Sequence, residues 1–318
     1  MFSDFTAHLT ELPTAIVTNS NNSHSLSESY DYCMNLFSLH AKSFHFASRY
    51  LDIEQRRSTA ALYSFCRLVD DFADEIDLPK AELERELDQL DDIIDRLSDG
   101  EVFHHPILHA FGDTMTRYEI PTRYLHELVE GVRMDVNLTE VKTVKELDSY
   151  CYHVASTVGI LMCHVWGADG KETLDRAADL GHAMQITNIL RDIGEDYVNG
   201  RIYLPAETRM EFRVRKADFE AAEPSANLKW LIKHEIARAR SLYAKAEIGI
   251  RDLPPAPAFT VKVAARVYSE ILNEIEGMNY NVLSKRAVVP KWKKLLIAYR
   301  LRREYLRDAK DLTSISKE

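Results

Sequence analysis

The sequence predicts an all-α protein. Two observations lead to this prediction: the sparse placement of glycine and proline, and the helical spacing of the apolar residues. The 318 residues include only 11 glycines and 10 prolines. Most of these separate long segments in which apolar residues recur at helical spacing. No run of alternating apolar and polar residues, which would indicate strands, interrupts this pattern. We therefore expect helix after helix with short connections.

The individual helices follow from this periodicity in chain order. They cover residues 26–50, 54–77, 80–98, 107–117, 122–136, 143–166, 171–197, 227–249, 259–283 and 291–309. Prolines fall in the gaps, where a fixed φ and a missing N–H are tolerated; they are Pro79, Pro106, Pro121, Pro205 and Pro290.

A single domain is the simplest organisation for these helices. We expect it to span residues 26–310, preceded by a disordered lead-in, 1–25, and followed by a C-terminal tail, 311–318. The proline-rich stretch 252–259 is the strongest candidate for a linker. It is only a few stiff residues long, so it need not divide two domains.

Composition and charge exclude several classes of protein. The chain is 46% hydrophobic and 28% charged, as in an ordinary soluble globular protein. Its net charge of −10 disfavours nucleic-acid binding, which depends on basic contacts to phosphate. No stretch reaches the roughly 18 apolar residues of a membrane-spanning helix. The first residues also lack the basic and apolar regions of a secretory signal.

Cysteine usage indicates the compartment. The four cysteines form no CxxC pair and cannot build a disulfide framework in a chain of this length. Cys33, Cys66, Cys151 and Cys163 are therefore expected to be packed thiols. A reducing compartment, the cytoplasm, is the location that this pattern favours.

The segment RLVDDFADE places several carboxylates in a helix whose flanks predict burial. At 100° per residue, Asp70 and Asp74 share one narrow stripe with Arg67. Asp71 and Glu75 point about 100° further round the helix, where they are structural or support the stripe. Aspartate is a poor helix former, so a solvated face would more often use glutamate or lysine.

A second segment, QITNILRDIGED, repeats this polar geometry. Gln185, Asn188, Asp192 and Asp196 again form one stripe, with apolar residues covering much of the remaining surface. Carboxylates at positions i and i+4 stand roughly 5–6 Å apart at Cβ. Short oxygen ligands at that spacing suit Mg²⁺, which takes one or two carboxylates together with substrate phosphates. Two matching stripes make a solvated face a poor explanation.

Arginines accompany both acidic stripes. Arg67 lies in the first, Arg191 precedes Asp192, and Arg201 follows the second. A guanidinium pairs bidentately with carboxylate or with phosphate oxygens, so each arginine alone fits a salt bridge as well as a phosphate contact. Acids, metal ions and arginines among apolar residues together predict a site for a lipid diphosphate.

Several blocks of sequence recur in the order and spacing of a known family. They are HAKSF (40–44), YSFCRLVDDFADE (63–75), YCYHVASTVG (150–159), QITNILRDIGEDYVNGRIYLP (185–205) and ARVYSEIL (265–272). On these blocks the chain resembles the squalene/phytoene synthase family of head-to-head trans-isoprenyl diphosphate synthases, over about residues 38–295. It is most similar to bacterial-type phytoene synthases. The resemblance implies a single-domain isoprenoid-synthase helical bundle with a central apolar cavity.

The resemblance also implies a role for individual residues. Mg²⁺, with Mn²⁺ as the alternative ion, would be held by Asp70, Asp74, Asp192 and Asp196. The substrate diphosphates would be bound by His40, Lys42, Ser43, Gln185, Asn188, Arg191 and one of Lys285 and Arg286. The prenyl chains would face Phe44, Val154, Ala155 and Gly159, although plain core packing competes with this interpretation for Val154 and Ala155.

Catalytic roles are implied for a further set of residues: Tyr63, Arg67, Tyr150 and Tyr268. Arg67 would neutralise diphosphate charge. The tyrosines would line the diphosphate end of the site. There Tyr150 and Tyr268 would orient the substrate, relay a proton or stabilise cationic character, and the sequence does not choose among these roles.

The implied reaction is the Mg-dependent head-to-head condensation of two geranylgeranyl diphosphates, through a cyclopropylcarbinyl diphosphate, to phytoene in carotenoid biosynthesis. Metal ions and arginines would stabilise charge on the departing diphosphate, and a dry cavity would protect the allylic cation from water. The alternative is a C15 member that makes presqualene diphosphate, dehydrosqualene or squalene from farnesyl diphosphate. NADPH, which squalene formation needs, is not expected as a cofactor here.

Three other classes share parts of this pattern. A head-to-tail elongase or a terpene cyclase uses similar metal chemistry, but the second motif lacks DDxxD or an Asn/Ser/Glu triad. A carboxylate di-iron bundle needs two Glu-x-x-His pairs. The sequence has one, Glu101 to His104, and it follows Asp99-Gly100, a dipeptide typical of loops rather than of helices. A non-catalytic binding or assembly protein of the same fold would not need intact aspartates in both stripes.

The C-terminal segment KWKKLLIAYRLRREYLRDAK, residues 291–310, mixes basic and apolar residues. With Trp292 it fits a helix that lies on anionic lipid, to which a hydrophobic product must be delivered. An ordinary surface helix is the alternative. We therefore expect prenyl diphosphates as ligands, peripheral contact with a membrane, and a downstream desaturase as a protein partner.

Overall fold

The computed structural model describes residues 24–74, 80–136 and 138–315, without the side chains of residues 43, 72–74 and 306–315. Within these ranges the chain is helical and contains no strand, while Glu140 and Ile202 form an isolated β-bridge. The predicted all-α class is therefore confirmed.

The helices follow one another in the expected order. The α-helices are α3 (Leu26–His40), α4 (Lys42–Ser48), α5 (Ile53–Asp74), α6 (Lys80–Ser98), α7 (Pro106–Arg117), α8 (Thr122–Val136), α9 (Val144–Cys151), α10 (Thr157–Val165), α11 (Lys171–Val198), α12 (Ala206–Glu211), α13 (Ala226–Gly249), α14 (Pro255–Gly277) and α15 (Lys291–Ile315). Short 3₁₀ turns follow α12 and α13, and a π-helical turn, η1 (Tyr152–Ser156), joins α9 to α10.

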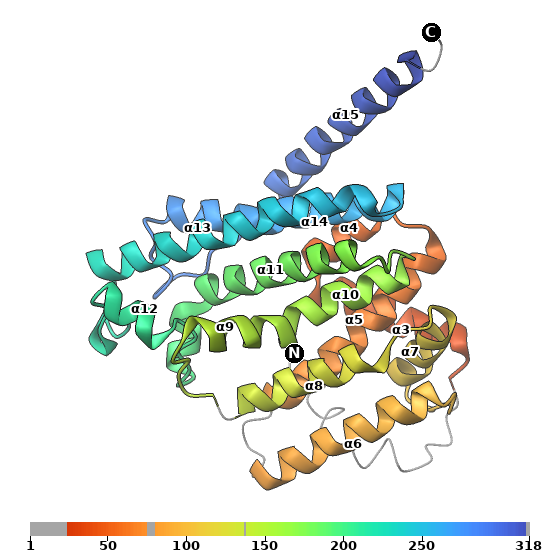
Figure 1. The fold of residues 1–318 in the computed structure, drawn as a ribbon, viewed down its shortest axis with the longest axis horizontal. Coiled ribbons are helices and arrows are strands. Elements are labelled where there is room, and N and C mark those ends of the chain that lie inside the picture. Colours follow the sequence, from red (N-terminus) through yellow and green to blue (C-terminus); the bar gives the residue numbers. More distant parts are fainter. Residues whose placement is uncertain (1–23, 75–79, 137, 316–318) are drawn as a thin grey trace.

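Helix α11 runs through the middle of the bundle (Figure 1). It packs against α13 and α14 on one side and against η1 and α10 on the other. Helices α3, α5, α7 and α8 build the adjoining part of the molecule, and α6 covers α8. The second acidic stripe therefore lies on a central helix.

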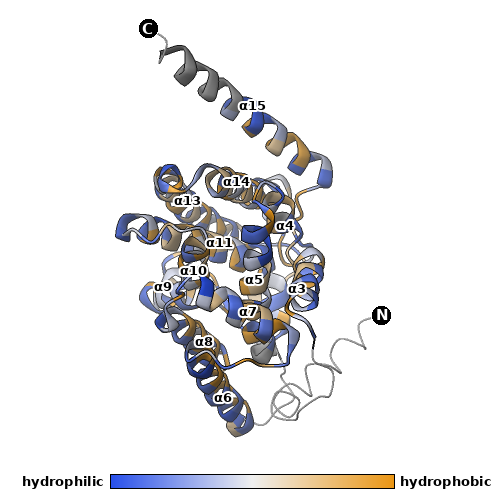
Figure 2. Ribbon diagram, turned by 90° about the vertical axis from the view of Figure 1, so that its right-hand side faces the viewer, coloured by the Kyte–Doolittle hydropathy of each residue, from blue (hydrophilic) through white to orange (hydrophobic). Residues whose placement is uncertain are grey.

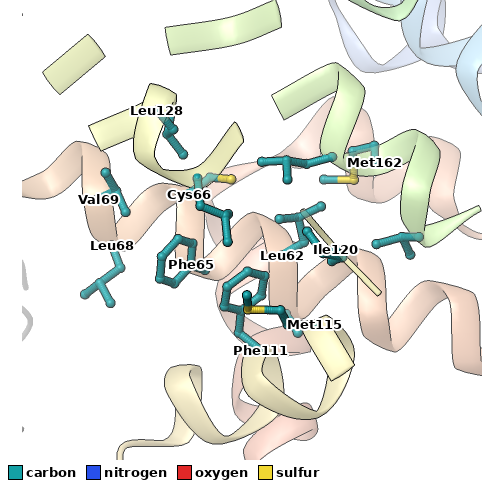
Figure 3. Packing of buried hydrophobic residues seen from close by; sticks show 14 of the residues in the cluster. Leu62, Phe65, Cys66, Leu68, Val69, Phe111, Met115, Ile120, Leu128 and Met162 are labelled. Atoms are coloured by element: carbon teal, nitrogen blue, oxygen red, sulfur yellow. The ribbon is translucent and has the colours of Figure 1, made fainter. Parts of the chain in front are cut away.

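Helix α5 shows how the sequence builds the core. Leu62, Phe65 and Val69 are fully buried, as the apolar stripe of this helix predicts. Phe65 stacks on Phe111 of α7 with ring centroids 4.2 Å apart (Figure 3). Each such side chain contributes roughly 1.5–3 kcal/mol by leaving water. This packing fixes the rotation of α5 and thereby the direction of its polar stripe.

Two of the expected helices are interrupted. The segment expected to be helical over 26–50 breaks at Ala41, whose φ of −100° and ψ of 49° lie outside the helical region. The break turns α4 so that Phe44 meets Phe37 edge-on, with centroids 5.7 Å apart. The segment expected over 143–166 contains η1 in its middle.

Other differences concern the ends of helices. Helix α14 begins at Pro255, because prolines are tolerated in a first turn, and ends at Gly277 rather than at 283. Helix α15 continues to Ile315, past the expected end at 309 and into the segment expected to be a tail. Helix α12 was not expected. The lead-in expected over 1–25 lies almost entirely outside the described residues, as does the end of the helix expected over 54–77.

Two features that the sequence analysis did not expect, a membrane-spanning helix and a disulfide framework, can be checked in the described residues. None of the helices there is both long enough and apolar enough to cross a membrane. All four cysteines are buried free thiols, as expected from the sequence.

Candidate active site

A cavity of about 530 Å³ opens among α4, α5, η1, α10, α11 and α14. It brings together most of the residues that the sequence indicates as a site. They are His40, Lys42, Phe44, Tyr63, Arg67, Asp70, Tyr150, Val154, Ala155, Gly159, Gln185, Asn188, Arg191 and Tyr268. Residues from eight elements, α3, α4, α5, α9, η1, α10, α11 and α14, therefore line one space.

The other site candidates with described side chains, Asp192, Asp196, Lys285 and Arg286, are not in the cavity wall. Asp192, Arg286 and Asp196 form a charged group next to it, joined to the wall through Arg191. Lys285 is exposed on the same loop as Arg286. The side chains of Ser43 and Asp74 lie outside the described residues, although Asp74 is the last residue of α5.

On α5, the partner of Arg67 differs from the one that the stripe suggests. Its guanidinium forms a close ion pair with Asp71, while Asp70 Oδ2 is 3.8 Å away. The Asp71 side chain is 12% exposed and that of Asp70 65%. Burial disfavours the charged form of Arg67, but Asp71 and Asp70 outweigh it and raise the arginine's pKa. Asp71 is thus a structural partner that leaves Asp70 turned to the cavity.

Arg67 also has an unused donor. Its Nε–H is buried and finds no hydrogen-bond acceptor within the described residues. A buried donor without a partner costs about 1–3 kcal/mol, which an anionic ligand in the cavity would recover. His40 lies near this arginine, and burial together with Arg67 lowers the pKa of His40, so the imidazole is neutral at pH 7.

On α11, two guanidinium groups hold Asp192. Arg191 Nε donates to Asp192 Oδ1 over 2.9 Å, and Arg286 Nε approaches the same oxygen at 2.9 Å. The Asp192 side chain is only 16% exposed. Of the two basic residues that the sequence could not separate, the structure places Arg286 against Asp192.

Asp196, one turn further along α11, lies in a more negative environment. Burial raises its pKa to about 7, and the carboxylates of Asp192 and Asp135 add to the rise, while Arg201 opposes it. Sequence reasoning missed Asp135. It is an isolated acid at the end of α8, without a repeated motif to draw attention to it.

Asp135 is buried in a small polar network. Tyr203 donates its hydroxyl to Asp135 Oδ1 over 2.6 Å, and Arg201 lies 3.1 Å from Oδ2. The ring of Tyr203 stacks on that of Tyr150, with centroids 5.1 Å apart. Burial, Asp135 and Tyr203 together raise the pKa of Tyr150 well above its usual value. Tyr150 is therefore held in place as a protonated phenol.

A chain of hydrogen bonds joins α14 to the second stripe. Tyr268 donates its hydroxyl to Asn188 Oδ1 over 2.6 Å, and Asn188 Nδ2 donates to Gln185 Oε1 over 3.2 Å. The tyrosine thereby fixes which way the Asn188 amide points. Tyr63 faces the same cavity, and burial raises its pKa to about 12.

The apolar wall depends on the π-helical turn. Val154 and Ala155 of η1 line the cavity, wedged between two glycines. A Cβ on Gly131 of α8 would come within 2.9 Å of Val154, and one on Gly181 of α11 within 2.3 Å of the Ala155 carbonyl oxygen. π-helical turns occur often at functional sites. Glycines on both sides therefore let η1 fit between α8 and α11.

Gly159 lines the cavity and also lets two helices pack closely. A Cβ there would lie 2.7 Å from the carbonyl oxygen of Ala177 on α11. The family resemblance implies that Gly159 faces a prenyl chain; the structure adds that α10 and α11 can approach closely here only at a glycine. Other apolar wall residues escaped sequence analysis because their spacing is that of ordinary core positions; among them are Leu128, Met162, Trp166, Leu180, Met184 and Ala264.

The donor set can be tested against a divalent cation. No group of three potential metal ligands is assembled among the side chains that the structure describes, which do not include Asp74. The available donors are carboxylate and amide oxygens, the type that Mg²⁺ and Mn²⁺ prefer. Burial and then the neighbouring carboxylates raise the pKa of Asp196 although Arg201 opposes the rise, so a bound cation would stabilise the charged form of this carboxylate. These residues fit a hard divalent cation.

Comparisons with known proteins agree with this picture. Residues 38–293 match the sequence profile described as Squalene/phytoene synthase. The chain is 33% identical to a phytoene synthase of Arthrospira platensis, over 85% of this chain and 91% of the relative. It is 34% identical to phytoene synthase 2 of Solanum lycopersicum, over 86% of this chain and 91% of the relative.

Solved structures share the fold. A dehydrosqualene synthase crystallised with a ligand matches with a TM-score of 0.82 at 27% identity, over 89% of this chain and 98% of the other. The squalene synthase HpnC from Alicyclobacillus acidocaldarius matches with a TM-score of 0.74 at 26% identity, over 80% of this chain and 96% of the other.

Proposed function

The chain belongs to the squalene/phytoene synthase family of prenyltransferases, and we propose that it condenses two geranylgeranyl diphosphates head to head to phytoene. The observation that carries the proposal is the cavity itself, whose lining combines apolar side chains with charged residues of both motif helices, Arg67, Asp70 and Arg191 among them. The phytoene synthases among its relatives support the C20 substrate.

The cationic residues would bind the substrate diphosphates. Lys42, Arg67 and Arg191 all contribute to the cavity wall. Arg67 offers its unused Nε–H, and charge-assisted hydrogen bonds from arginine to phosphate oxygens are among the strongest in proteins. Arg286, beside Asp192, would support the same charge from the loop after α14.

The acidic residues would hold Mg²⁺, with Mn²⁺ as the alternative ion. Asp70 and Asp74 on α5 and Asp192 and Asp196 on α11 are the proposed ligands. When bound, the ion supplies positive charge that stabilises the departing diphosphate. The Asn188 and Gln185 amides, fixed by Tyr268, would orient the diphosphate beside these carboxylates.

The apolar wall would protect the cationic intermediates. A cavity closed to water prevents an allylic cation from being captured by hydroxide or water. Aromatic faces stabilise cations electrostatically, and Phe44 and Trp166 both line the cavity. Tyr63 and Tyr150, like any phenol, are protonated at neutral pH, and burial raises both pKa values further, so they would act as hydrogen-bond donors rather than as bases.

The length of the cavity supports a C20 chain. Along α11 its lining runs from Arg191 to Thr173, about 27 Å at 1.5 Å per residue. An extended C20 prenyl chain measures roughly 19 Å and a C15 chain roughly 14 Å, at about 1.25 Å per carbon–carbon bond. The lining residues on α11 therefore span more than either extended chain, which leaves room for the C20 chain that the phytoene synthase relatives suggest.

A diphosphate-release assay tests whether the site is catalytic. We expect Mg²⁺-dependent release of diphosphate from geranylgeranyl diphosphate, without added NADPH. Asp70→Asn should lower the rate at least about a hundredfold, because one member of the charge-stabilising group is lost. Asp175→Asn, a change of an exposed acid on α11 that pairs with Lys171, should leave the rate unchanged. No release by the wild type would favour a non-catalytic protein of this fold.

A further inference from the structure

Helix α15 leaves the body of the protein (Figures 1 and 2). Its first half is attached: Ala298 and Leu301 are buried in a cluster with residues of α4 and α14. Lys293 forms ion pairs with Glu270 and Glu274 on α14. The helix is thus fixed at its base and projects from there.

The opposite face of this base is apolar and uncovered. Trp292 is 64% exposed, Leu295 57% and Tyr299 59%. Together with Leu296 these residues lie within an arc of about 100° on the helix. We call these four residues the outer face of α15. Large apolar side chains gathered on one exposed face usually mark an interaction site.

Charges beside the outer face indicate which surface it fits. Among the described side chains of α15, up to residue 305, the exposed cations are Lys291, Arg300, Arg302 and Arg303, and the exposed acid is Glu304. The whole chain, by contrast, carries a net charge of −10. A local positive region favours a negatively charged surface and disfavours the symmetric pairing of two outer faces, because their cations would then face each other.

The base of α15 is also next to the cavity. Burial lowers the pKa of Lys294, and the positive charge of Lys42 lowers it further, which places these two amines near each other. Lys42 lines the cavity. Phe44 both lines the cavity and packs against the cluster that contains Ala298 and Leu301. Short helix α4 therefore separates the cavity from α15.

We propose that the outer face of α15 docks the protein on an anionic lipid bilayer, with the α4 wall of the cavity held near the lipid surface. Trp and Tyr favour the interface between headgroups and acyl chains, and nearby Lys and Arg are attracted by anionic lipids. Delivery of product rests on the proposed function: a hydrocarbon that has lost its diphosphate has no charged group, so the bilayer is its natural solvent.

Vesicle co-sedimentation tests the docking without substrate. We expect at least tenfold stronger binding to phosphatidylglycerol vesicles than to phosphatidylcholine vesicles, weakened by salt. The double variant Trp292→Ser with Leu295→Ser should lose about tenfold. Its matched control is Trp230→Ser with Ile248→Ser on α13, whose side chains are 60% and 63% exposed, and this control should bind like the wild type.

Charge reversal provides the second arm. Arg300→Glu with Arg302→Glu should abolish the preference for anionic vesicles, whereas Arg213→Glu with Arg215→Glu, which changes exposed cations near α12, should preserve it. Diphosphate release in detergent solution should be the same in all these variants, so docking and catalysis are read separately. Three results would overturn the proposal. The wild type binds anionic vesicles no better than neutral ones, the α15 double variant binds vesicles as well as its α13 control, or the α15 double variant converts a dimer of the protein into monomers.

Discussion

Asp196 is a carboxyl group that burial and neighbouring acids push toward the protonated form. Its pKa of about 7 lies above that of an unfolded aspartate, about 3.9. The folded state therefore binds more protons than the unfolded state between about pH 4 and 7. Across that window the metal-free protein loses stability as pH rises, and the whole loss is present above pH 7.

Asp196→Asn should remove this loss. In metal-free buffer we expect urea denaturation to show the variant more stable than wild type at pH 8, by on the order of 4 kcal/mol at most, and nearly equal at pH 5. Added Mg²⁺ should stabilise wild type at pH 8 and the variant much less. Asp175→Asn, which changes an exposed acid on α11 that pairs with Lys171, should show neither effect. Equal pH dependence of wild type and Asp196→Asn would contradict the charge balance described here.

Asp70 and Asp71 are adjacent but should differ in what their loss affects. Asp71→Asn leaves Arg67 without its close partner in a half-buried place, so we expect a loss of about 1–3 kcal/mol in stability. Asp70→Asn removes an exposed cavity carboxylate and should reduce turnover with little change in unfolding. Urea midpoints and initial rates of both variants compare the two effects; a stability loss confined to Asp70→Asn would reverse the assignment.

The positions of the polar cavity residues on α5 and α11 could be predicted because helical periodicity alone decides which side chains share a face. Asp70, Gln185 and Asn188 illustrate this. The sequence interpretation set Asp71 apart from the stripe of Arg67, Asp70 and Asp74. At i+4, however, Asp71 lies only about 40° round the helix from Arg67, and it is the less exposed acid of the two that Arg67 can reach. Asp135 could not be predicted as a site residue either. It lies on α8, which carries no repeated acidic motif, and only the fold brings it near Asp196.

At the scale of elements, η1 and its two glycines determine how α8, α10 and α11 meet. Local sequence gives helix over the whole of this region, and the π-helical turn is visible only in three dimensions. The break at Ala41 is similar: alanine favours helix, and the packing of Phe44 against Phe37 accompanies the turn. Long periodic helices were predictable, whereas interruptions set by packing between helices were not.

Gly181→Ala should test this wedge. A Cβ would lie 2.3 Å from the Ala155 carbonyl oxygen, so helices must separate and we expect a loss of roughly 1–3 kcal/mol or more. Gly277→Ala at the end of α14 meets nothing within 4 Å and should be neutral or stabilising by up to about 1 kcal/mol. Chemical denaturation measures both; if the two variants unfold alike, the close approach of η1 and α11 is wrong.

At the scale of the whole molecule, the bundle encloses an apolar cavity, gathers acids from α5 and α11 near one part of it, and carries α15 next to its wall. The all-α class was predictable from the placement of glycine and proline and from the helical spacing of the apolar residues. The cavity wall was not, because Met162, Leu180 and Met184 have the same spacing as core residues. Whether such a residue faces a void or a neighbour depends on the packing of several helices.

The most direct measurement identifies the product. Purified protein is incubated with Mg²⁺ and either C20 or C15 diphosphate, with and without NADPH, and the hydrocarbon is identified by mass spectrometry. We predict phytoene from the C20 substrate, unaffected by NADPH, and little product from the C15 substrate. Presqualene diphosphate, dehydrosqualene or squalene as the main product from the C15 substrate, with none from C20, would contradict the account.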